Sequence, residues 1–234
     1  MRRTRSLVFV ILIALGASTA LAHIPRASWL MSRMAKQRQK MNLRRMVVEL
    51  RCGPDAEHLE PAKLYLEIPR RVRWERADGS VLICNGGRCL LQREGAAAQQ
   101  LDDWVLLQFL FFVERQTRGE RWLRLLRSLK VDTGVDTLTR AGSRLAVVLG
   151  AKEWERDRPQ FWIDKSRYLP LRLMFEHGRQ LMDIRWAEWG GRHTGDWFPG
   201  RFEVRADGER QVLCQADHVE VNRSIPDALF ELKK

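Results

Sequence analysis

The sequence predicts an α+β fold that is mainly antiparallel β: an unclosed, curved barrel or half-barrel of about eleven strands, with an N-terminal helix and two apolar lid or plug helices. Three observations support this fold class. Short segments of alternating polarity recur between turn residues along most of the chain. Residues 102–129 interrupt them with two apolar segments of helical length. No shift in composition and no linker divides the 234 residues.

The first 22 residues have the three parts of an export signal. Arg2, Arg3 and Arg5 form a basic start, residues 7–15 form an apolar run, and residues 20–22 form a small-x-small cleavage site. We predict cleavage after Ala22 and a single soluble, exported domain over residues 23–234. The alternative is an uncleaved N-terminal anchor, although the apolar run is shorter than the roughly 20 residues of a stable span.

The first half of the predicted domain is a helix followed by strands. Residues 27–41 have apolar side chains near a 3.6-residue period, which predicts a helix. Residues 43–51, 63–68 and 71–76 alternate between apolar and polar side chains, as half-buried strands do. Residues 80–93 read as a hairpin around Gly86 and Gly87, which completes about five strands.

Two helices and a second group of strands follow. Residues 102–115 begin with two acids and then leave almost no polar face, so this helix must be buried or must cover something apolar. An ordinary core helix and a lid over an apolar cavity are both consistent with this pattern. Residues 119–129 form an amphipathic helix. The remaining predicted strands are residues 135–140, 144–149, 160–163, 171–176, 180–189, 202–205 and 211–221.

Charge and cysteine content fit an exported protein. The net charge is +12, and a basic exported protein could bind anionic lipid headgroups, cell-wall polymer or extracellular DNA. The basic residues are interleaved with acids in most segments, and their densest cluster, residues 33–45, lies on a predicted helix. We therefore interpret the charge as a solvated surface and expect no nucleic-acid binding. If Gly86 and Gly87 form the turn, Cys84 faces Cys89, and a disulfide there is geometrically reasonable. Cys52 and Cys214 then remain as a candidate long-range pair. The alternative is four buried thiols.

The sequence contains none of the common catalytic or cofactor signatures. Its five His are far apart, and nucleophile-elbow, phosphate-loop and dinucleotide motifs are absent, so we expect no metal, no cofactor and no enzymatic activity. Asp132-Thr133-Gly134 resembles the motif of homodimeric aspartic proteases, with Asp132 as the catalytic residue. The same three residues also suit a plain turn, and we keep the protease only as a remote alternative.

Several motifs resemble the periplasmic outer-membrane lipoprotein carriers, the Lol-type or lipoprotein-sorting family. Ile68-Pro69 followed by Val72-Arg73-Trp74 is similar to that family's R-P-x-x-F-x-W strand pair, and the hairpin at 83–88 has the family's spacing from the tryptophan. Residues 161–172 and 219–230 resemble two later segments of the group. The typical carrier has Arg where this chain has Ile68, so the resemblance implies a divergent member.

The resemblance implies a periplasmic, non-enzymatic and monomeric binding protein that shields acyl chains for transfer toward the outer membrane. Its partners would be the acyl chains of a lipoprotein or another lipid, together with candidate inner- and outer-membrane transport proteins. The alternative is a periplasmic sensor or adaptor of the same fold that binds a protein partner. We expect the sheet and the lid to contribute the residues that line the apolar cavity: Leu66, Trp74, Trp104, Leu107, Phe109, Leu110, Phe111 and Phe112.

Overall fold

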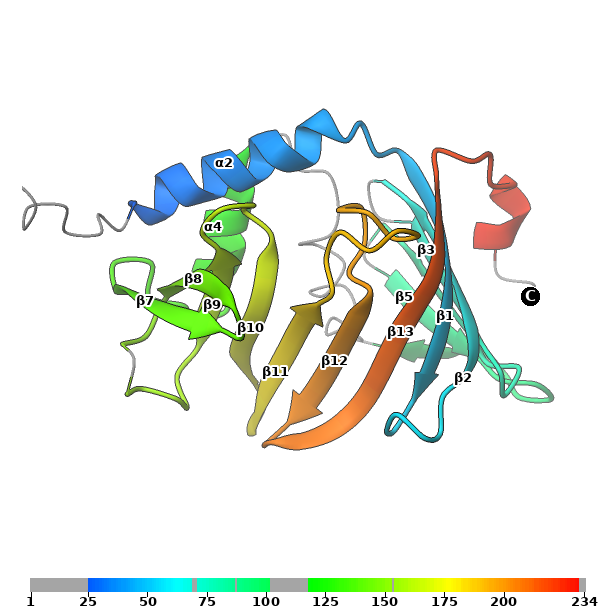
Figure 1. Ribbon diagram of the computed structural model, residues 1–234. Helices are drawn as coiled ribbons and strands as arrows, with labels where there is room; N and C mark the ends of the chain where they lie inside the picture. Colours follow the sequence, from blue (N-terminus) through cyan, green and yellow to red (C-terminus); the bar gives the residue numbers. More distant parts are fainter. Residues whose placement is uncertain (1–24, 69–70, 87, 102–117, 153, 232–234) are drawn as a thin grey trace, which may run out of the picture.

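The computed structural model describes residues 25–68, 71–86, 88–101, 118–152 and 154–231. All strands in these ranges belong to one antiparallel sheet of thirteen strands, in the order β6-β5-β4-β3-β2-β1-β13-β12-β11-β10-β9-β8-β7. The end strands β6 and β7 do not pair with each other in the described ranges, so the curved sheet stays open (Figure 1). The predicted fold class is therefore confirmed.

The N-terminal half of the sheet is a meander. Strand β1 (Arg45–Gly53) is followed by β2 (Glu60–Glu67), β3 (Arg71–Arg76), β4 (Val81–Asn85), β5 (Arg88–Gln92) and β6 (Gln99–Leu101). Each strand pairs with the next one along the chain, as short turns between alternating segments require. The three-residue β6 is a strand that the sequence analysis does not predict.

The C-terminal half is a second meander that returns to the first. Its strands are β7 (Asp136–Ala141), β8 (Arg144–Leu149), β9 (Gln160–Asp164), β10 (Pro170–His177), β11 (Gln180–Ala187), β12 (Arg201–Ala206) and β13 (Glu209–Val221). The long β13 pairs with β1 from Met46↔Val221 to Gly53↔Leu213. This contact joins the two meanders into one sheet.

Two helices lie on one side of the sheet (Figure 1). Helix α2 (Ala27–Lys40) and helix α4 (Gly119–Ser128) coincide closely with two predicted helices and pack against each other. A short 3-10 helix, η1 (Asp227–Phe230), lies near β3 and β4. The predicted helix at 102–115 lies entirely outside the described ranges. No helix within the described ranges has both the length and the hydropathy that a membrane crossing requires.

The sheet has two different faces because side chains alternate along each strand. We call the face that packs with the helices the inner face. It carries the main hydrophobic cluster, in which Leu30 and Met34 of α2 and Trp122 of α4 meet the apolar residues of the strands. On the outer face, charged side chains dominate, apart from a small cluster of Val47, Ile225 and Phe230 under the C-terminal segment.

Candidate functional site

The two sheet residues predicted to line a cavity both lie on the inner face. Leu66 of β2 is 2% exposed and Trp74 of β3 is 5% exposed, and both belong to the main hydrophobic cluster. In the strand register, Trp74 stands between Leu64 of β2 and Leu82 of β4. The alternation of residues 63–68 and 71–76 therefore brings the predicted pair to the same apolar surface.

Trp74 differs from an ordinary core residue in two respects. Its indole N–H is buried and has no hydrogen-bond partner in the described structure, an arrangement that costs about 1–3 kcal/mol. The guanidinium of Arg76 lies over its ring, 4.9 Å from the ring centre.

A cavity of about 270 Å³ adjoins Trp74 at one end of β1, β2 and β3. Its volume is just below the range of about 300–1,000 Å³ that is typical of small-molecule sites. The space is therefore smaller than a typical site for a whole small molecule. Its walls come from the ends of inner-face strands and from the turns beside them: Cys52, Gly53, Pro54, Glu60, Pro61, Ala62, Trp74, Arg76, Ala77, Asp78, Gln211 and Val212.

The predicted lid residues lie outside the described ranges. This applies to Trp104, Leu107, Phe109, Leu110, Phe111 and Phe112. The structure places Leu66 and Trp74 on one apolar face, and of these two only Trp74 lines the cavity. The role of all eight residues in binding a ligand stays a prediction.

Both candidate cysteine pairs are disulfides. Cys84 and Cys89 face each other across the β4–β5 hairpin, with a Cα–Cα distance of 4.1 Å. Cys52 and Cys214 are directly opposite in the β1–β13 pair, and their Cα atoms are also 4.1 Å apart. The described chain has no free cysteine. The prediction of a Cys84–Cys89 bond is confirmed, and the alternative of four free thiols is wrong.

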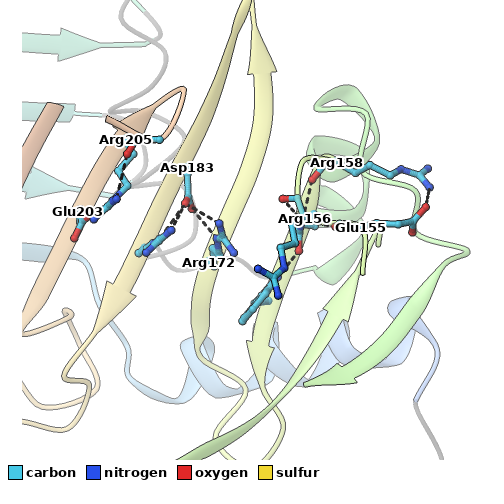
Figure 2. Close-up of polar contacts among 11 residues, drawn as sticks. Glu155, Arg156, Arg158, Arg172, Asp183, Glu203 and Arg205 are labelled. Atoms are coloured by element: carbon cyan, nitrogen blue, oxygen red, sulfur yellow. Dashed lines mark hydrogen bonds and ion pairs between the residues drawn. The ribbon is translucent and has the colours of Figure 1, made fainter. Parts of the chain in front are cut away.

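The outer face carries a larger groove, of about 700 Å³, that the sequence analysis does not predict. It lies over β7–β11, beside the loop between β8 and β9, and charges of both signs line it. The groove is lined by four cationic and four anionic side chains: Lys152, Arg156, Arg172 and Arg185, and Glu155, Asp157, Asp183 and Asp207. Figure 2 shows the hydrogen bonds from Arg172 to Asp183, from Arg158 to Glu155 and from Arg205 to Glu203. This balance of charges gives the groove no net preference for anions or cations.

The centre of this groove is an ion-paired carboxylate. Asp183 accepts two hydrogen bonds of 2.8 Å from Arg172 and two of 2.9 and 2.7 Å from Arg185. Burial alone would raise the pKa of Asp183, but the hydrogen bonds from Arg172 and Arg185 outweigh it and hold the pKa below its usual value. Asp183 is therefore a stable anion in the folded protein rather than a proton donor.

Asp132 has a structural role in the turn between α4 and β7. Its carboxylate accepts a hydrogen bond of 2.9 Å from the backbone N–H of Gly134. Such a bond between a carboxylate and the N–H two residues later defines an Asx turn. The turn interpretation therefore accounts for Asp132-Thr133-Gly134.

Comparisons with known proteins give matches to solved structures alone. No model of a known protein family and no curated protein matches the sequence. A DUF1329 family protein from Desulfovibrio piger matches with 10% identity and a TM-score of 0.56, over 89% of this chain and 98% of that one.

Two further matches each have a TM-score of 0.50. A LolA superfamily protein from Nitrosomonas europaea has 13% identity and a TM-score of 0.50, over 89% of this chain and 99% of that one. A putative outer membrane lipoprotein-sorting protein domain from Vibrio parahaemolyticus has 9% identity and a TM-score of 0.50, over 85% and 95%. Similarity at this level of identity concerns the fold. The chain has the open, helix-covered antiparallel fold of these structures, as the motif resemblance predicts.

Proposed function

We propose that the protein is an exported, non-enzymatic carrier that shields the acyl chains of a lipoprotein or another lipid from water during transfer toward the outer membrane. The observation that carries this proposal is the apolar inner face of an open sheet, with the cavity at Trp74 at one end. The fold of the lipoprotein-sorting structures supports it, and so do the two disulfides, which are typical of an oxidising compartment such as the periplasm.

The physical basis of such carriage is transfer free energy. Each methylene group moved from water to an apolar surface contributes about 0.8 kcal/mol. An acyl chain therefore binds strongly without any directional contact. The inner face offers the required surface through side chains such as Leu64, Leu66, Val72 and Trp74. No covalent step is needed for such binding.

The direct test is analysis of bound lipid. The protein is purified from an exporting host, extracted with organic solvent, and the extract is examined by mass spectrometry. We expect at least one acylated lipid in stoichiometric amount. A protein free of lipid that instead captures a single protein partner would contradict the carrier and support the sensor or adaptor alternative.

A cavity-filling variant tests the position of the ligand. Ala62 of β2 lines the cavity beside Trp74, so Ala62→Phe should fill it without removing any core side chain. We expect the bound chains to be shorter or their affinity to fall at least about tenfold, which corresponds to losing contact with roughly two methylene groups. The measurement is displacement of a fluorescent fatty acid.

A matched control adds the same bulk on the other face. Thr139 of β7 lines the outer groove, so Thr139→Phe should leave fatty-acid displacement unchanged. Equal losses in both variants would mean that the effect is general destabilisation. No loss in Ala62→Phe, with folding intact, would remove the cavity from the proposed binding site.

A further inference from the structure

The exposed side of α2 carries positive charge and no negative charge. The sequence contains no Asp or Glu from His23 to Val48. Arg26 precedes the helix, and Arg33, Lys36 and Lys40 are exposed on it. None of these four cations takes part in an ion pair of the described structure, in contrast to most of the arginines on the outer face of the sheet.

Helix α4 adds to the positive charge of the helical layer. Its Arg121, Arg124 and Arg127 are exposed, and Glu120 is its one acid. The two helices touch through their backbones, because a Cβ atom at Gly119 would lie only 2.5 Å from the carbonyl carbon of Met31. The first turn of α4 therefore lies against the middle of α2.

An exposed tryptophan accompanies these cations. Trp29 of α2 is 41% exposed. The guanidinium of Arg33 lies 4.9 Å from its ring centre, and the ring of Tyr168 meets it edge-on at 5.8 Å. Tryptophan and basic side chains on one helix face are the composition of helices that lie at the interface of anionic membranes.

We propose that the exposed side of α2 is a docking surface for a bilayer that contains anionic phospholipids. The apolar side of α2 is already occupied, because Leu30, Met31 and Met34 are fully buried in the core. The helix would therefore rest on the headgroups through its cations, and Trp29 would enter the interfacial region. This inference deepens the proposed carrier function, since docking would bring the helical layer and the inner face behind it to a membrane that supplies or receives lipid.

Charge complementarity favours a lipid surface of this kind. Each Lys or Arg near an anionic leaflet strengthens binding by about fivefold, and the attraction declines within a Debye length. Trp29 favours a bilayer over an acidic protein, because its aromatic body and single N–H suit a region that is apolar on one side and wet on the other. The test below also distinguishes a bilayer from an acidic protein partner.

The test is sedimentation of the purified protein with vesicles of phosphatidylcholine alone or of phosphatidylcholine and phosphatidylglycerol at a ratio of about 7:3. We expect binding to the anionic vesicles, weak binding to the neutral ones, and loss of binding at high salt. Arg33→Gln/Lys36→Gln/Lys40→Gln should weaken binding by about 100-fold, from about fivefold for each charge. Trp29→Ala should weaken it severalfold.

Two matched controls change the same residue types elsewhere. Arg93→Gln/Arg156→Gln/Arg179→Gln removes three exposed cations from turns between strands, and Trp154→Ala removes a tryptophan that is 78% exposed in the β8–β9 loop. Both controls should bind like the wild type. The mass of the purified protein shows whether residues 1–22 have been removed. Only protein without these residues is used, because their apolar run could itself bind vesicles.

Three results would overturn the proposal. They are equal binding to both vesicle types, no vesicle binding by the wild type, and losses in the control variants equal to those in the α2 variants. Retention on immobilised polyglutamate without vesicle binding would assign the surface to an acidic protein. Fatty-acid displacement in solution, measured on the same variants, stays at the wild-type value if docking and acyl-chain binding are separate. If the wild-type protein binds anionic vesicles but does not bind the fluorescent fatty acid, the carrier function alone is contradicted.

Discussion

At the scale of single residues, Asp183 illustrates how the outer face tolerates a buried charge. The residue is 5% exposed, yet its four hydrogen bonds from Arg172 and Arg185 keep it ionised. A carboxylate whose pKa is lower in the folded than in the unfolded state stabilises the protein at any pH above its unfolded pKa, about 4. That contribution is lost as the pH falls through the folded pKa.

Asp183→Asn should therefore lower the free energy of unfolding by about 2–3 kcal/mol at pH 7. The cost is below that of breaking a fully buried pair, because Arg185 is partly exposed. The difference between variant and wild type should shrink as the pH falls from about 6 to 3, in urea unfolding followed by circular dichroism. Asp217→Asn, which breaks an exposed pair with Arg51, should cost at most about 1 kcal/mol. A difference that does not change with pH would contradict the assigned role of the Asp183 charge.

At the scale of elements, the contact between α2 and α4 depends on a missing side chain. Gly119 opens α4, and a Cβ atom there would lie 2.5–2.7 Å from the backbone of Met31 and Ser32. Replacing glycine by alanine in a helix normally stabilises it by about 0.5–1 kcal/mol. Here the clash involves backbone atoms, so the two helices must move apart.

Gly119→Ala should accordingly destabilise the protein by about 1–3 kcal/mol, the range for overpacking a core. The measurements are thermal unfolding and hydrogen exchange, and the exchange rates should rise first in the amides of α2 and α4. Ser128→Ala, at the exposed other end of α4, should change stability by less than about 0.5 kcal/mol. A more stable Gly119→Ala protein would show that the two helices are not held at this distance.

The elements also show what the sequence can and cannot predict. Strands β2 and β3 were predictable because Leu64, Leu66, Val72 and Trp74 alternate with polar residues, and this alternation follows directly from burial of one face. Strand β6 was not predictable, because Gln99 and Gln100 bury no apolar face and the strand is held by backbone pairing with β5. The outer groove was missed for a related reason. Its walls come from five strands, the β8–β9 loop and the β12–β13 turn, and only the sheet register brings them together.

At the scale of the whole molecule, the β1–β13 pair joins two meanders that are formed by separate halves of the sequence. Cys52–Cys214 crosslinks this pair over a separation of 162 residues, whereas Cys84–Cys89 closes a hairpin over a separation of 5. A crosslink stabilises mainly by restricting the unfolded chain, and the restriction grows with the length of the closed loop. The chain-entropy relation gives about 5 kcal/mol for the long loop and about 2 kcal/mol for the short one.

The two disulfides should therefore differ in their effect on global stability. Cys52→Ala/Cys214→Ala should lose up to about 3 kcal/mol more than Cys84→Ala/Cys89→Ala in guanidinium unfolding at equilibrium, because only the long crosslink restricts most of the unfolded chain. Hydrogen exchange distinguishes the two cases further. Loss of the long crosslink should raise exchange in both meanders, while loss of the short one should raise it mainly in β4 and β5. Equal losses of stability in the two double variants would mean that strain or residual structure in the unfolded chain, rather than loop length, sets the contribution of each bond.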